Sequence, residues 1–232
     1  MKSQKMLGIA LSLLLLAACK KNTPLLGPIV EKPDPLELLG DSASYAIDGK
    51  LSIVNKVNSG IAFYLQSNAK IDSIVKGNIY YSGDKDSVLY GRSYDIHDSE
   101  YHNTISFFFL KKYHKNTLKP QEIRPKNQMD LYMVDKYSYA LDFKRTNSQN
   151  GVALEVCNHN VNYQTYGSES LREPQALKPD AQSQSKFEIT NLRKLKSGRY
   201  ILEAKFSATI FDRNFKPKKI ENGYVRLKLG YL

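Results

Sequence analysis

The chain has 232 residues, of which 34 are Lys or Arg and 23 are Asp or Glu, so its formal charge is +11. Hydrophobic residues make up 41% and charged residues 25%, proportions that exclude wholesale disorder, collagen-like repeats and a membrane protein with many spans. The length suits one sizeable domain or two small ones.

The N-terminus has the organisation of a secretory signal. Lys2 and Lys5 give it a positive start, and residues 7–18 are a run of apolar and small side chains. As a helix this run would be about 18 Å long, which is short of the roughly 30 Å hydrocarbon core of a bilayer. We therefore predict that residues 1–18 are a cleaved signal peptide and not a membrane span.

The run ends in Leu16-Ala17-Ala18-Cys19, which resembles the lipobox of bacterial lipoproteins. In that family the cysteine thiol is diacylated, the chain is cut just before it, and the new amino group is usually acylated too. The resemblance implies that Cys19 is the lipidated first residue of the mature chain. Two or three acyl chains give a stable anchor, because each buried CH₂ contributes about 0.8 kcal/mol. A plain signal peptide with a chance cysteine is the alternative.

The residues after Cys19 bear on location. In enterobacterial lipoproteins an Asp after the cysteine favours the inner membrane, and Lys20 stands there instead, so we expect the outer membrane. Lys20-Lys21-Asn22 lacks the acidic stretch that takes some Bacteroidota lipoproteins to the cell surface, so the periplasmic and surface faces both stay open. Residues 19–43 hold four of the nine prolines and predict a semi-rigid, Pro-rich tether.

Processing changes both the charge and the cysteine count. Loss of Lys2 and Lys5 leaves 32 basic and 23 acidic residues, a formal charge of +9 on the mature chain. Cys157 is the only other cysteine, so no intramolecular disulfide can form once Cys19 is lipidated. The domain must therefore be stabilised by its hydrophobic core.

From about residue 44, apolar and polar residues alternate with a period of two, which is typical of strands. The first such stretch, residues 45–53, contains Asp48-Gly49, a signal for a two-residue hairpin turn. Phe107, Phe108 and Phe109 are adjacent, which predicts a strand covered on both faces. Further strands are expected at residues 61–65, 71–81, 88–94, 105–110, 137–143, 152–157, 186–192, 199–211 and 224–229, with a hairpin loop at 82–86.

These strands predict the fold class. About ten of them, with no long helical stripe, indicate an all-β sandwich or barrel. We predict an antiparallel β-sandwich of about ten strands behind the tether, as a single domain over residues 44–232. Residues 115–127 and 167–185 are expected to be long loops, and residues 128–136 are the best candidate for a short helix.

Short motifs at the two ends of this domain add a second resemblance. They are Tyr45-Ala46-Ile47-Asp48-Gly49-Lys50, Gly198-Arg199-Tyr200, Ala204-Lys205-Phe206-Ser207-Ala208-Thr209 and Ile220-Glu221-Asn222-Gly223-Tyr224-Val225. They look like segments of small uncharacterised envelope lipoproteins of Bacteroidota. The resemblance implies an exported β-sandwich and transfers no site residues.

The densest polar cluster lies at residues 95–102. Its five potential metal ligands are Asp95, His97, Asp98, Glu100 and His102. Nitrogen and oxygen ligands of this kind suit a divalent metal. An extended strand would point them to opposite faces, so a compact site would need a turn. The other reading, which we prefer, is a solvated hairpin loop.

A second candidate is Cys157, two residues before His159. An imidazole that lowers the pKa of a thiol makes a nucleophile, and on one strand the two side chains would point the same way. No family signature surrounds them. We prefer a small buried cysteine at a strand end followed by a polar turn.

Basic residues and tyrosines suggest binding instead of catalysis. Basic clusters lie at residues 111–115, 193–199 and 216–219, and outside the cytoplasm they would attract lipid head groups, lipopolysaccharide phosphates or acidic glycans. The chain has 16 Tyr and no Trp. The tyrosines considered for stacking on sugars are Tyr80, Tyr81, Tyr90, Tyr94, Tyr163 and Tyr166. Half-buried strand positions and solvated loop tips are the alternatives.

The sequence thus predicts a lipid-anchored envelope protein that is a binding or structural module, not an enzyme, with no metal or cofactor and with Cys19 as its one modification site. Expected partners are the membrane, through the lipid on Cys19, and an envelope glycan, lipopolysaccharide or outer-membrane protein. Nucleic acid is not expected. The alternatives are a glycan- or anionic-polymer-binding surface lipoprotein and a metal- or Cys-dependent envelope enzyme.

Overall fold

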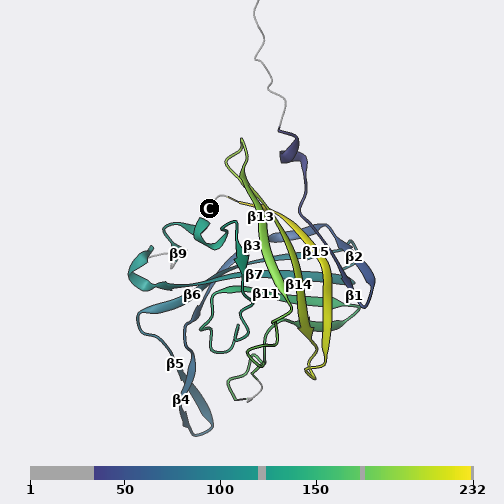
Figure 1. Ribbon diagram of the computed structural model, residues 1–232. Coiled ribbons are helices and arrows are strands. Elements are labelled where there is room, and N and C mark those ends of the chain that lie inside the picture. Colours follow the sequence, from purple (N-terminus) through teal and green to yellow (C-terminus); the bar gives the residue numbers. More distant parts are fainter. Residues whose placement is uncertain (1–33, 120–123, 173–175, 231–232) are drawn as a thin grey trace, which may run out of the picture. The chain divides into compact units, whose positions relative to one another are not determined.

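The computed structural model describes residues 34–119, 124–172 and 176–230 (Figure 1). The predicted signal peptide, Cys19 and residues 20–33 of the tether lie outside this part of the chain, so what was inferred about them from the sequence stays a prediction. Among the described residues no helix is long and apolar enough to cross a membrane.

The described chain consists of fifteen strands and three short 3-10 helices. The first half holds η1 Pro35–Leu38, β1 Ser42–Ile47, β2 Lys50–Val54, β3 Lys56–Gln66, β4 Lys70–Val75, β5 Asn78–Ser82, β6 Ser87–His97 and β7 Asn103–His114. The second half holds η2 Lys115–Thr117, β8 Leu118–Lys119, β9 Arg124–Pro125, η3 Gln128–Leu131, β10 Lys136–Tyr137, β11 Gly151–Asn158, β12 Val161–Gln164, β13 Lys186–Lys194, β14 Tyr200–Phe211 and β15 Pro217–Leu229.

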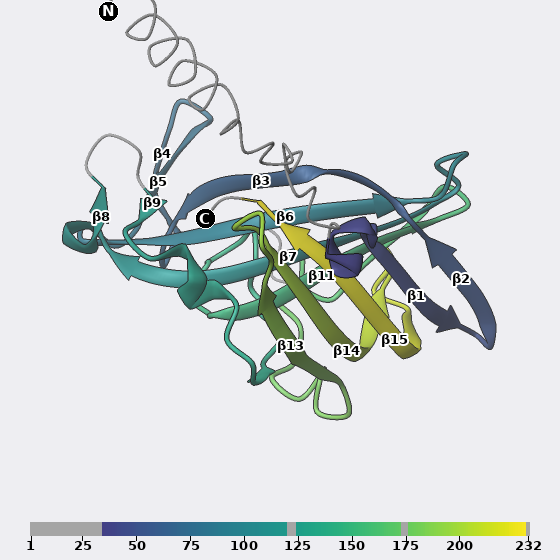
Figure 2. The same ribbon diagram turned by 90° about the horizontal axis from the view of Figure 1, so that it is seen from above.

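Eleven of these strands form one sheet that folds over on itself. Its order is β2-β1-β15-β14-β12-β11-β7-β6-β3, with β13 beside β14 and β10 beside β13. Strands β12 and β14 are joined by one residue pair, Gln164 with Phe211, and this junction separates two layers. The strands of the two layers cross at a steep angle (Figures 1 and 2). The all-β antiparallel sandwich is therefore confirmed, and both of its layers come from one curled sheet.

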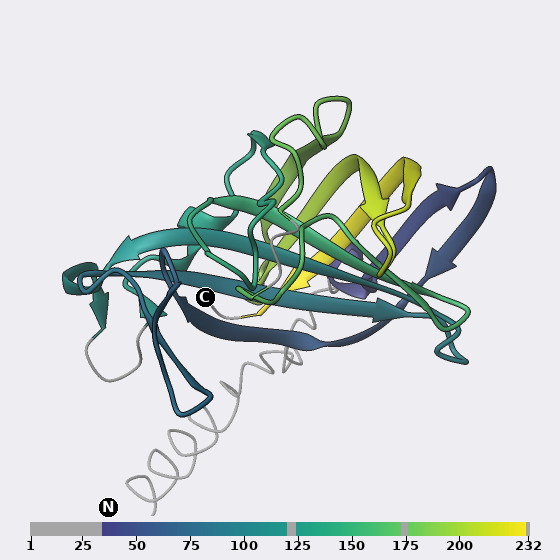
Figure 3. The same ribbon diagram turned by 90° about the horizontal axis from the view of Figure 1, so that it is seen from below.

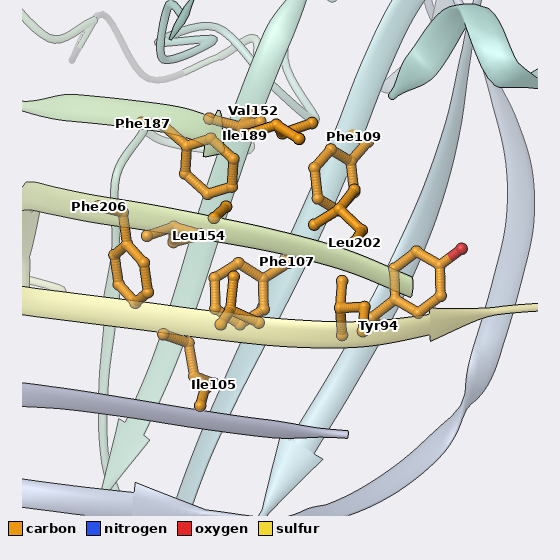
Figure 4. Close-up of a cluster of buried hydrophobic side chains, with 14 of the residues drawn as sticks. Tyr94, Ile105, Phe107, Phe109, Val152, Leu154, Phe187, Ile189, Leu202 and Phe206 are labelled. Atoms are coloured by element: carbon orange, nitrogen blue, oxygen red, sulfur yellow. The ribbon is translucent and has the colours of Figure 1, made fainter. Parts of the chain in front are cut away.

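The main core fills the space between the two layers. Strand β7 contributes Ile105, Phe107 and Phe109, and the opposite layer contributes alternate residues of β13, β14 and β15 (Figure 4). The rings of Phe107 and Phe206 meet edge to face, with centroids 5.3 Å apart. Each large apolar side chain buried in this way contributes about 1.5–3 kcal/mol, so the layers are held together chiefly by their facing side chains.

The prediction that residues 105–110 form a doubly covered strand is also confirmed. Phe108 points away from the main core, into a second cluster with Leu110, Phe143 and Tyr166. The rings of Phe108 and Phe143 lie 4.8 Å apart. Strand β7 is therefore buried on one face by the opposite layer and on the other by residues from the loop segments that follow β10 and β12.

The expected single strand at residues 71–81 is wrong. This segment is a hairpin of its own, β4 and β5, which turns at Lys76-Gly77, where Lys76 has a φ of 50°. Gln66 at the end of β3 pairs with Val88 of β6, so the β4–β5 hairpin is an insertion between two paired strands. Residues 82–86 accordingly connect β5 to β6 and do not close a hairpin between neighbouring strands.

The expected strand at residues 137–143 is wrong for most of its length. After β10, only Tyr139 keeps a bridge, to Val152. The chain then turns around Asp142, whose Oδ2 accepts hydrogen bonds from Thr146 Oγ1 at 2.6 Å and Ser148 N at 2.7 Å. Gly151, at a φ of 134°, lets the backbone at the start of β11 lie close to the backbone of Ser138. A Cβ at this position would be only 2.0 Å from the Ser138 carbonyl oxygen. The apolar side chains of this stretch thus cover β7 from a loop.

The last residues of the predicted tether are bound to the domain. The Ser197 amide donates to Glu37 Oε1 at 2.8 Å, and Lys228 Nζ donates to the Glu37 carbonyl at 2.9 Å. Arg199 Nη2 lies 3.7 Å from Glu37 Oε2, whereas Leu38 is exposed. Polar contacts therefore hold the short η1 helix in place, and the compact unit begins at Asp34.

The buried tyrosines predict loss of stability at alkaline pH. Burial raises the pKa of Tyr45 to about 12 and raises the pKa of Tyr94 and Tyr139 as well. An unfolded tyrosine ionises near pH 10, so the folded state holds these protons more tightly. The contribution of these tyrosines to the free energy of unfolding is therefore fully present below about pH 10 and is lost as the pH rises through their raised pKa values.

Tyrosinate absorbance and the circular dichroism of the sheet, followed together against pH, check this expectation. The buried tyrosines should ionise only as the sheet signal is lost, whereas the chain in urea should titrate near pH 10. Ionisation of all 16 tyrosines with the sheet signal intact would contradict it.

Candidate functional site

The polar cluster at residues 95–102 forms the hairpin between β6 and β7. Asp98 shapes this turn: its Oδ1 accepts from His102 N at 2.9 Å, and its Oδ2 accepts from Asn103 N at 3.0 Å. His97 is buried beneath the ring of Tyr101, with centroids 3.8 Å apart. Within the described ranges, no three His, Cys, Asp or Glu side chains are grouped so that they could hold a metal ion. The Asp98 carboxylate accepts hydrogen bonds from the backbone of the turn, so its role in this hairpin is structural.

Cys157 and His159 are separated by the end of a strand. Strand β11 ends at Asn158, and His159 and Asn160 form the two-residue turn to β12, with φ values of 48° and 68°. His159 Nδ1 is hydrogen-bonded to Asn158 Oδ1 at 2.8 Å, and its ring stacks on that of His102. The strand alternation that would have placed the thiol and the imidazole on one face therefore stops before His159.

A charged network that the sequence analysis missed lies on the outer face of β11. Lys144 Nζ donates to Glu155 Oε1 at 2.6 Å and to Glu169 Oε1 at 3.1 Å. The buried Tyr166 hydroxyl also donates to Glu155 Oε1. The ammonium lies 5.7 Å from the ring centroid of Phe108, a distance at which a cation is attracted to an aromatic face. These residues come from separate segments, so no local pattern marks them.

The pKa shifts in this network indicate that its charged and polar groups interact with one another. Burial lowers the pKa of Lys144, but hydrogen bonds and charge from Glu155 and Glu169 outweigh it, so the net pKa lies above the ordinary value. Burial and the charge of Glu155 raise the pKa of Tyr166 far above its ordinary range. Lys144 is therefore protonated, Tyr166 is neutral, and both donate to carboxylates. The network fastens two loop segments to the sheet.

A cavity of about 480 Å³ lies between the edge strand β3 and the η2–β8 segment. We call it the lysine cleft. It is lined by Tyr64, Gln66, Asp84, Ser87, Val88, Lys115, Leu118 and Lys119. Figures 2 and 3 show the β8 segment and the β4–β5 hairpin at the same end of the sheet.

Strand alternation positions the wall of the lysine cleft. Phe63 and Leu65 of β3 pack on the second core cluster, so Tyr64 between them faces the other side of the sheet. The side chain of Tyr64 remains 54% exposed, whereas Val88 and Leu118 beside it are buried. The cleft therefore combines an accessible aromatic ring on an ordered strand with an apolar floor.

The charges of the lysine cleft do not cancel. Asp84 Oδ2 accepts from Asn68 Nδ2 at 2.7 Å and lies 3.0 Å from Lys112 Nζ, and these hydrogen bonds lower the pKa of its carboxyl. Lys112 therefore balances Asp84. Lys115 and Lys119 are exposed and form no ion pair with any residue in the part of the chain that the structure describes. Two positive charges remain available at the cleft.

The other two basic segments are partly neutralised. Arg199 faces Glu37, and Arg193 lies 3.9 Å from Asp34. Lys218 Nζ lies 2.6 Å from Asp48 Oδ2. Of the three basic segments, the one at residues 111–115 thus brings an unpaired lysine to a cavity.

The tyrosines considered for sugar stacking divide in the structure. Tyr90, Tyr94 and Tyr166 are buried in the two core clusters, so that prediction is wrong for them. Tyr80 and Tyr81 are exposed on the β4–β5 hairpin, and Tyr163 is partly buried against the main core. Tyr64, which the sequence analysis did not single out, is the tyrosine that lines the lysine cleft. Its alternation with Phe63 and Leu65 was the available signal.

Comparison with known proteins found no matching family model, no matching curated protein and no matching solved structure.

The charged network predicts a measurable loss of stability for Lys144→Met. Hydrogen bonds to charged groups contribute about 1.5–3 kcal/mol when buried, and partial exposure reduces this, so we expect the free energy of unfolding to fall by about 1–2 kcal/mol. Chemical denaturation measures the change. Lys205→Met is the control, because Lys205 is exposed on β14, and it should change stability by less than about 0.5 kcal/mol. Equal effects of the two substitutions would contradict the structural role of the network.

Proposed function

We propose that this protein is a lipid-anchored module of the bacterial cell envelope that binds an anionic polymer. The observation that carries the binding proposal is the lysine cleft, where Lys115 and Lys119 lack carboxylate partners among the described residues beside the exposed ring of Tyr64. An unpaired positive charge at a concave surface attracts polyanions and raises their association rate.

The anchor is supported by the sequence. The positive start, the short apolar run and Leu16-Ala17-Ala18-Cys19 occur together in the order that lipidation requires. Residues 20–33 separate Cys19 from the first described residue. A lipid on Cys19 would keep the domain at a membrane, and Lys20 in place of Asp favours the outer membrane, where lipopolysaccharide phosphates and acidic glycans are the abundant anions.

The charge of the mature chain is consistent with this class of partner. Removal of residues 1–18 leaves 32 basic and 23 acidic residues. At +9 the mature chain repels other cations and is attracted to an anionic matrix over about one Debye length, roughly 8–10 Å at physiological salt. Lys115 and Lys119 would then bind anionic groups of the polymer at one place on the surface, the lysine cleft.

A second candidate, a subunit of an outer-membrane assembly, is favoured by the β4–β5 hairpin. Ile74, Tyr80 and Tyr81 are more than half exposed on this two-stranded unit, which pairs with no strand of the main sheet among the described residues. Exposed apolar side chains grouped on one element are typical of protein contact sites. A stoichiometric partner that stays bound at high salt would favour this candidate over polymer binding.

Replacement of Cys19 tests the anchor. Cys19→Ser removes the thiol that the acyl chains require, so the variant should take up no radiolabelled palmitate and should lose its tight association with the membrane fraction. Cys157→Ser is the matched control and should be labelled and fractionated like the native protein. A Cys19→Ser variant that remains labelled and membrane-bound would contradict lipid anchoring at this residue.

Salt dependence tests the binding mode. Full-length protein in detergent should bind an acidic polysaccharide at low salt, and the affinity should fall steeply as salt is raised, because exposed charges are screened. A neutral polysaccharide of similar size is the control and should bind weakly at every salt concentration. Absence of binding to any acidic polymer at low salt would contradict the proposed function.

A further inference from the structure

We propose that the lysine cleft is a subsite for an acidic sugar residue, in which the ring of Tyr64 packs on the sugar ring and Lys115 and Lys119 bind its carboxylate or phosphate. This inference rests on the proposed function and names the part of the polymer that is recognised.

The size of the cleft suits a short segment of a polymer. Its volume of about 480 Å³ lies within the range of roughly 300–1,000 Å³ that small-molecule sites occupy. It lies beside β3, an edge strand of the main sheet, so a chain that continues beyond the bound residue has a route into solvent. Such a site encloses one part of a long ligand and leaves the rest outside.

The apolar lining matches one face of a sugar ring. Phe63 and Leu65 pack on the opposite side of the sheet and hold the backbone of β3, so the exposed Tyr64 side chain is presented at a fixed position of the cleft wall. A pyranose presents C–H groups on its faces, and an aromatic side chain covers such a face while its hydroxyl stays in water. Val88 and Leu118 extend the apolar surface.

The polar lining matches the edge of a sugar ring. Gln66 and Ser87 offer both donors and acceptors, which sugar hydroxyls need. Asp84 offers an acceptor that is held by Asn68 and Lys112. Inorganic phosphate, or the phosphate of a lipid head group, would accept from the lysines, Gln66 and Ser87, but neither presents an apolar ring face that would pack on Tyr64. The combination of ring, amide, hydroxyl and carboxylate therefore favours an acidic sugar over either of them.

The experiment compares three ligands of equal length on the full-length protein in detergent. They are an oligogalacturonate, a phosphorylated oligomannose and a neutral malto-oligosaccharide. At least one acidic ligand should bind about tenfold or more tightly than the neutral one, because a charge-assisted contact of this kind commonly changes affinity by that factor. The two acidic ligands distinguish a carboxylated glycan from a phosphorylated one, and either supports the proposal.

Variants locate the binding. Lys115→Gln/Lys119→Gln should weaken the acidic ligand about tenfold or more, whereas Lys186→Gln/Lys205→Gln removes the same charge from exposed strand positions and should have little effect. Tyr64→Ala should weaken binding, and Tyr64→Phe should retain it, since the ring is kept. Circular dichroism confirms that each variant is folded.

The outcomes separate the two proposals. The inference is overturned, and the proposed function stands, if the native protein binds an acidic ligand but Lys115→Gln/Lys119→Gln binds it as tightly as the control Lys186→Gln/Lys205→Gln does. Equal losses for Tyr64→Ala and Tyr64→Phe would overturn the stacking contact. If the native protein binds neither acidic oligosaccharide at low salt but does bind an acidic polymer, the inference fails and the proposed function stands. If it binds no acidic polymer either, both fail.

Discussion

Burial of both faces of β7 is the constraint on which the rest of the domain depends. Phe107 and Phe109 enter the main core, and Phe108 enters the second cluster on the other face. A central strand of this kind is stable only if something covers each side. The opposite layer covers one side, and loop segments that carry Phe143 and Tyr166 cover the other. The irregular chain after β10 is therefore part of the core, although it is not part of the sheet.

This requirement explains why the main charged network lies where it does. The covering loops have few backbone pairs of their own, and Lys144 supplies contacts to Glu155 on β11 and to Glu169 beyond β12. Its position under the rings of the second cluster keeps it partly dehydrated, which strengthens those contacts. The lysine cleft differs in this respect, because two of its cations have no protein anion to satisfy them among the described residues.

Local periodicity made much of the fold predictable. The hairpin at Asp48-Gly49, the alternation along β14 and the adjacent phenylalanines of β7 each describe faces of a single strand or turn, and each prediction holds. Periodicity was misleading at residues 137–143, where alternate apolar residues serve a loop that packs on a sheet. The turn at Lys76-Gly77 was missed because the apolar residues on both sides of it were read as one strand, although Gly77 after a polar residue is itself a turn signal.

The candidate site was much less predictable, and the reason is physical. The residues of the lysine cleft come from β3, the connection to β6, β6 itself and the η2–β8 segment, which only the folded sheet brings together. A count of lysines in a segment does not show which of them meet a carboxylate across the fold. Lys112 pairs with the Asp84 carboxylate, whereas Lys115, only three positions further along, pairs with no carboxylate in the described chain.

The pairing of Gln66 with Val88 has a consequence for how this protein can change over evolution. Because β3 and β6 pair on both sides of the inserted β4–β5 hairpin, the two ends of the insertion are held next to each other by the main sheet. Lengthening or shortening a segment between fixed, adjacent ends costs little free energy and leaves the register of the strands unchanged. The hairpin is therefore a position at which descendants of this chain can exchange one surface element for another while they keep the same core.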